Sequence, residues 1–91
     1  MDKLTREKRQ EVKNAYKARD LHQELSTKIN EIGPLPLFKR SRRARQYLLV
    51  QLNLEQLADC VGALTKNTMV SEAADLLNLY LTLEKYAEEN P

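Results

Sequence analysis

A stiff apolar joint at residues 33–38, which reads Gly-Pro-Leu-Pro-Leu-Phe, constrains the fold more than any other feature of the sequence. Each proline fixes its own φ and drives the preceding residue toward an extended conformation. We therefore predict a non-helical linker over residues 33–40, after a helix that ends in a left-handed glycine cap at Gly33. Strong helix formers dominate the rest of the chain, which predicts an all-α fold.

Apolar residues spaced three and four apart predict three helices, over about residues 3–32, 41–66 and 69–88. Asp2 is the expected N-cap of the first helix. A chain of 91 residues has room for one core, so we expect residues 1–91 to form a single helical domain. The short turn near residue 67 predicts an antiparallel hairpin of the second and third helices. The result is a three-helix bundle with a long first helix.

The first helix has a continuous apolar face only after residue 12. Its first three turns therefore project beyond the bundle, fray, or pack on another subunit. His22 lies near the centre of that face. Its imidazole is expected either to be buried and neutral, or to form a pH-sensitive contact at an interface.

The residues that catalysis requires are nearly absent. One His and one Cys cannot supply a zinc cluster, and no Gly-rich loop is present to hold a phosphate. Cys60 lies among Leu57, Val61 and Leu64, so we expect an inert core thiol. The sequence predicts no catalytic residue, no metal site, no cofactor and no enzymatic activity.

Charged residues interrupt every apolar stretch before the length that a membrane span needs, about 18 residues. The N-terminal residues also lack the apolar core of a signal peptide. We expect a cytoplasmic protein that does not associate with membranes, and a single cysteine agrees with a reducing compartment.

The charges are divided unequally along the chain. Residues 1–45 hold 13 Lys/Arg and 6 Asp/Glu, which gives +7, whereas residues 46–91 hold 2 and 7, which gives −5. Two cationic groups are candidate anion-binding residues. One group lies at the beginning of the second predicted helix and consists of Lys39, Arg40, Arg42, Arg43 and Arg45. The other lies along the first predicted helix and consists of Arg6, Arg9, Lys13 and Lys17.

Cations at a helix N-terminus are unfavourable, by about 0.3–1 kcal/mol each where exposed, so an anion is expected beside residues 39–45. The internal candidates are Glu84, Glu88 and Glu89, at the end of the third helix. The external candidate is a nucleic acid or another polyanion that the arginines contact through its phosphates.

Five large apolar side chains exceed what the predicted core needs and are candidate protein-interface residues: Leu35, Leu37, Phe38, Leu79 and Leu81. The first three either plug the end of the bundle or dock into a partner's groove.

Two functions remain open. The first is a non-enzymatic regulatory module that acts by stoichiometric binding of a protein partner and forms homo-oligomers. The second is a small nucleic-acid or anionic-ligand binder that uses the two basic groups.

Overall fold

A computed structural model describes residues 3–90 of the chain, with the side chains of residues 6–10 and 12–90. The expected N-cap, Asp2, lies outside the described residues. The helices are α1 (Lys3–Ile32), α2 (Leu37–Gln46), the π-helical turn η1 (Tyr47–Gln51), α3 (Leu54–Lys66) and α4 (Val70–Glu88). Residues 3–90 contain no strand, so the all-α prediction is confirmed.

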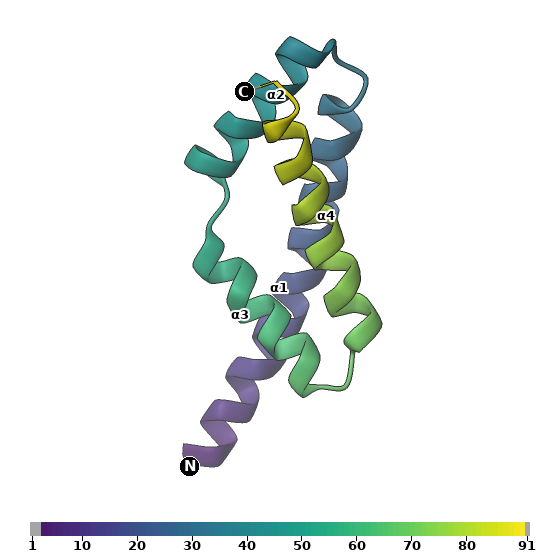
Figure 1. Ribbon diagram of the computed structural model, residues 1–91. Helices are drawn as coiled ribbons and strands as arrows, with labels where there is room; N and C mark the ends of the chain where they lie inside the picture. The colour runs from purple at the N-terminus through teal and green to yellow at the C-terminus, as the bar shows by residue number, and fades with distance from the viewer. Residues whose placement is uncertain (1–2, 91) are drawn as a thin grey trace.

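The molecule is elongated, at 53 × 24 × 18 Å, because α1 runs along almost its whole length. As Figure 1 shows, α4 runs beside α1 while α2 and α3 cover different parts of the α1–α4 pair. The first turns of α1 extend past the α3–α4 turn, and all described side chains from Arg6 to Gln10 are exposed. These turns are helical and project beyond the bundle, and their packing on another subunit stays a prediction.

The predicted linker over residues 33–40 is wrong in its second half, because α2 already begins at Leu37. Pro36 occupies the N-cap position (φ −54°, ψ 149°), where no intrahelical N–H is required, and its carbonyl oxygen accepts the Arg40 N–H at 2.9 Å. The predicted glycine cap is also wrong, since Gly33 does not have a positive φ. Space explains this glycine instead, because an added Cβ would lie 2.9 Å from the Ile29 carbonyl oxygen.

The predicted helix over residues 41–66 is also wrong, because the chain divides there into α2, η1 and α3. The helical backbone ends at Leu52, which is extended (φ −82°, ψ 126°). Asn53 then caps α3 by accepting the Gln56 N–H at 3.1 Å. This break lets α2 pack on the end of α4 while α3 packs on α1 and on the beginning of α4.

The core lies where α1, α3 and α4 meet, and it is extended by Ala44 of α2 and Tyr47 of η1. Leu25, Leu76 and Leu83 are fully buried at its centre. Cys60 is 1% exposed, which confirms the expected core thiol.

Candidate functional site

A groove of about 590 Å³ lies between α1 and the hairpin of α3 and α4. Ala18, Leu64 and Leu76 are its buried lining residues. Around its mouth three large apolar side chains are accessible to solvent. Their exposed fractions are 44% for Val12, 68% for Tyr16 and 38% for Met69.

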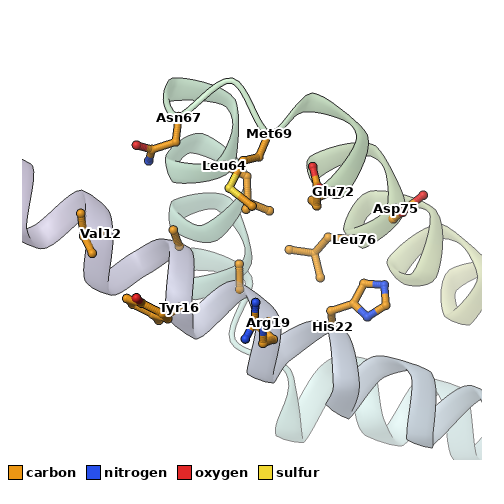
Figure 2. A pocket seen from close by; sticks show the side chains of 12 residues that line it. Val12, Tyr16, Arg19, His22, Leu64, Asn67, Met69, Glu72, Asp75 and Leu76 are labelled. Atoms are coloured by element: carbon orange, nitrogen blue, oxygen red, sulfur yellow. The ribbon is translucent and has the colours of Figure 1, made fainter.

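Opposite charges line the two walls of this groove. Glu72 and Asp75 come from the first turns of α4, while Arg19 and His22 come from α1 (Figure 2). Within the described residues, neither carboxylate forms an ion pair with Arg19 or His22 across the groove. The groove is therefore an apolar depression with an acidic wall on the α4 side.

His22 is exposed at the edge of the groove, so the prediction of a buried imidazole is wrong. The apolar face of α1 does continue through this position, because Leu21 and Leu25 are buried beside it. His22 remains accessible because it faces the groove rather than a packed helix.

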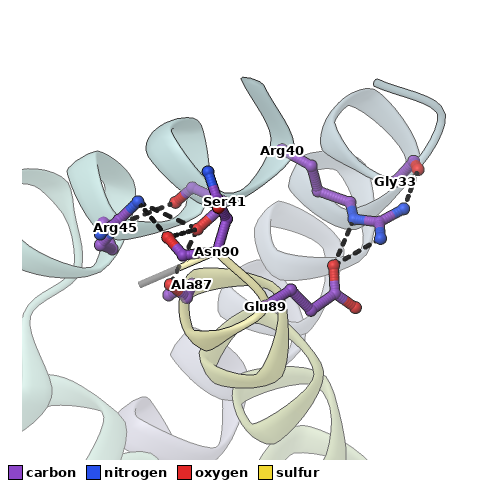
Figure 3. Close-up of polar contacts among 7 residues, drawn as sticks. All are labelled: Gly33, Arg40, Ser41, Arg45, Ala87, Glu89 and Asn90. Carbon is purple, nitrogen blue, oxygen red and sulfur yellow. Dashed lines mark hydrogen bonds and ion pairs between the residues drawn. The ribbon is translucent and has the colours of Figure 1, made fainter. Parts of the chain in front are cut away.

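The second constellation is polar and joins the beginning of α2 to the end of α4 (Figure 3). The Arg40 guanidinium forms an ion pair with Glu89 and donates its Nε–H to the same carboxylate at 2.7 Å. It also donates to the Gly33 carbonyl oxygen at 3.1 Å and lies 5.0 Å from the centre of the Tyr86 ring. One arginine thus connects the end of α1, α2 and the end of α4.

Ser41 and Arg45 complete the polar cluster. The buried Ser41 hydroxyl lies 2.9 Å from the Ala87 carbonyl oxygen, and Arg45 donates to the Asn90 carbonyl oxygen at 2.8 Å. Arg45 also donates to the Ser41 hydroxyl at 3.1 Å. Ala87 lies in the last turn of α4 and Asn90 follows the helix, at the end where the helix dipole favours cations.

The cationic run at residues 39–45 is therefore split by the structure. Arg40 binds Glu89, one of the predicted acidic partners, whereas Arg45 binds the uncharged Asn90 carbonyl oxygen. Arg42, Arg43 and Lys39 are exposed and form no ion pair or hydrogen bond within the described residues. Glu84, another expected partner, instead accepts a hydrogen bond from Tyr80 and thereby raises the pKa of that phenol.

The cations of α1 do not join those of α2. Arg6, Arg9, Lys13 and Lys17 are all exposed, but they lie toward the N-terminal end of the molecule, whereas α2 lies at the other end (Figure 1). The two candidate anion-binding groups therefore form separate surfaces.

The candidate protein-interface residues are also separated. Leu37 and Phe38 are 48% and 61% exposed at the beginning of α2, while Leu35 is half-buried beside a cavity of about 250 Å³. On α4, Leu79 packs partly against the core and Leu81 is 53% exposed. Leu37 and Phe38 thus do not plug the bundle end.

The surroundings of Cys60 and Tyr47 raise the pKa values of these two side chains. Burial, with Asp59 nearby, raises the pKa of the Cys60 thiol, while Lys17 opposes this change. The chemical consequence is a poorly nucleophilic thiol. Burial and Glu24 raise the pKa of Tyr47, whose hydroxyl donates to the Glu24 carboxylate at 3.1 Å.

Among the described side chains, no three of His, Cys, Asp or Glu lie close enough together to hold a metal ion. None of the described helices combines the length and the apolar character that crossing a membrane requires.

Sequence reasoning did not find the groove. Tyr16 lies on α1, whereas Met69, Glu72 and Asp75 lie at the beginning of α4, and only packing brings these two parts of the chain together. One signal was available, because Val12 and Tyr16 are apolar neighbours at i, i+4 that lie away from the main face of the helix.

Comparison with protein families, with curated proteins and with solved structures finds no significant match to this chain.

Proposed function

We propose that the chain is a non-enzymatic protein-interaction module that acts by stoichiometric binding through the groove between α1 and α4. One observation carries the proposal: an open apolar groove of about 590 Å³ has exposed Val12, Tyr16 and Met69 at its mouth. Exposed apolar depressions with polar edges are typical of protein-docking surfaces.

The shape and charge of the groove favour one class of partner, an amphipathic helix with cationic side chains. Its apolar side would cover the three exposed groove residues, as in other helix-in-groove complexes. Its cations would face Glu72 and Asp75 on the α4 wall.

Site-specific photocross-linking tests this proposal. A photoreactive phenylalanine analogue replaces Tyr16 in the groove or, as a control, Leu54, which is 55% exposed at the beginning of α3. We expect a saturable adduct with one protein at the Tyr16 position, competed by unlabelled chain and lost when Met69→Glu is added. Equal adducts at both positions, or an adduct indifferent to Met69→Glu, would contradict the proposal.

A second candidate function, binding of nucleic acid or another polyanion, is favoured by Arg42 and Arg43 beside Lys39, which are exposed and form no ion pair with any described residue. In that case affinity for duplex DNA falls steeply with salt. Replacing both arginines with alanine would then reduce the salt slope by about two, or one unit for each lost phosphate contact. A binding curve that is unchanged by the double substitution would exclude this surface.

A further inference from the structure

The first turns of α1 form a helical surface with no partner inside the described chain. From Arg6 to Gln10 every side chain is exposed, and the first fully buried residue of the helix is Ala18. Helical segments this short are marginal in water without tertiary contacts. A surface that covers this segment would therefore stabilise it.

The groove begins where the projection begins, because Val12 is both the first lining residue and the next described side chain after Gln10. At a rise of about 1.5 Å per residue, residues 3–10 span roughly 10 Å, and the α1 wall from Val12 to His22 spans roughly 15 Å. The projecting segment is thus long enough to cover about two thirds of the groove wall.

A two-fold axis near Val12 would cover both the projecting first turns of α1 and the groove in each copy. Two α1 helices that cross antiparallel at this residue place position 8 of one chain beside position 16 of the other. Each projecting segment then covers the other chain's groove, which gives a closed, symmetric pair rather than an open chain of copies.

The acids of the α4 wall agree with this pairing, whereas Arg19 on the α1 wall carries a charge of the same sign as the projecting segment. Residues 3–10 contain Lys3, Arg6, Lys8 and Arg9 against Glu7, a net charge of +3, and the α4 wall contributes Glu72 and Asp75. Lys8 lies one turn before Val12 on the same side of the helix. The outer face of α4, with exposed Val70, Leu77 and Leu81, is an alternative surface for pairing. It offers no such complementarity, because two paired α4 helices would bring their acidic side chains together and repel each other.

We propose that the helix bound in the groove is the beginning of α1 from a second copy of this chain. Residues 3–10 of each copy lie antiparallel along Val12–His22 of the other, and Lys8 of the second copy faces Glu72 and Asp75. This inference rests on the proposed function and names the partner of the same groove.

Sedimentation equilibrium of the full chain at micromolar to sub-millimolar concentration tests the pairing. The native chain should form dimers. Lys8→Glu and Asp75→Lys should each weaken dimerisation by about fivefold or more, because each substitution places like charges together at both ends of the symmetric interface. The combined variant should recover most of the affinity. Lys39→Glu, an exposed charge reversal on α2, is the matched control and should leave the dimer unchanged.

A disulfide test keeps the proposal falsifiable if a charge variant folds poorly. Mixing Lys8→Cys chains with Tyr16→Cys chains should give cross-linked pairs under mild oxidation, whereas Lys8→Cys with Gln23→Cys should not. Cys60 is buried and is left in place.

A native chain that stays monomeric at all these concentrations would overturn the inference. So would a dimer that is unaffected by both charge reversals and is lost instead with Leu81→Ser. The two proposals fail separately: a monomer that still cross-links another protein through position 16 removes the inference alone, whereas the absence of any groove-specific adduct removes the proposed function as well.

Discussion

Arg40 and Arg42 are two positions apart in one basic run, yet their surroundings differ. The Arg40 guanidinium is shared among Glu89, the Gly33 carbonyl oxygen and the Tyr86 ring. Arg42 is exposed and has no partner among the described residues. Arg40 thus joins three helices, whereas Arg42 remains available to solvent.

Replacing each arginine with alanine measures this difference. We expect Arg40→Ala to lower the free energy of unfolding by about 1–2 kcal/mol, because it removes a charge-assisted hydrogen bond and leaves Glu89 without its partner. Arg42→Ala should change it by less than about 0.5 kcal/mol. Urea unfolding at neutral pH gives both values, and equal effects would show that the Arg40 cluster adds no stability.

Tyr47 makes stability depend on alkaline pH. Its pKa is raised above the ordinary value of 10.0 in the folded chain, so the folded state retains a proton that the unfolded state loses. The stability that Tyr47 contributes through its raised pKa is present below about pH 10. It is lost as the pH rises from there toward the pKa of the folded state.

The variant Tyr47→Phe cannot ionise at this position. We expect it to be less stable than the native chain at about pH 8, where it lacks the hydrogen bond to Glu24, by roughly 1 kcal/mol. The difference should shrink at about pH 11, because only the native chain must keep a phenol protonated. Urea unfolding at the two pH values checks this, and a gap that is constant with pH would contradict the assignment.

At the scale of the elements, Asn53 separates α3 from the helical segment before it. Its side chain accepts the Gln56 N–H at the beginning of α3. Removing an N-cap of this kind typically costs about 1 kcal/mol, so Asn53→Ala should lower the free energy of unfolding by that amount. Asn53→Asp keeps an acceptor oxygen and should be close to neutral. Thermal unfolding of both variants is the measurement, and an equally unstable aspartate variant would rule out capping as the cause.

The break at Leu52 and Asn53 could not be predicted from apolar spacing. Tyr47, Val50, Leu54 and Leu57 continue a helical pattern across it, yet Val50 and Leu54 are 75% and 55% exposed. The pattern records apolar residues but not which of them contact the core. By contrast, the length of α1 was predictable because no strong helix breaker occurs before Gly33.

At the scale of the whole molecule, the antiparallel hairpin predicted from the sequence placed the basic residues 39–45 beside the acidic end of the last helix, with an external polyanion as the alternative. Arg40 with Glu89 confirms the internal contact for one arginine, although the predicted second helix divides into α2, η1 and α3. The groove was not predictable, because its volume depends on how α1 and the α3–α4 hairpin separate near Val12 and Met69. The spacing of residues in the sequence does not indicate how far α1 and the α3–α4 hairpin separate.

The central claim is that this groove binds a helix and that the beginning of α1 from a second copy is that helix. Amide hydrogen exchange of the native chain, followed by mass spectrometry at low and high protein concentration, tests it most directly. We expect the backbone amides of residues 6–10 to exchange fast in dilute solution. On concentration, these amides and those at the beginning of α4 should become protected together. Exchange at residues 6–10 that does not depend on concentration, or protection confined to the outer face of α4 around Leu77 and Leu81, would contradict it.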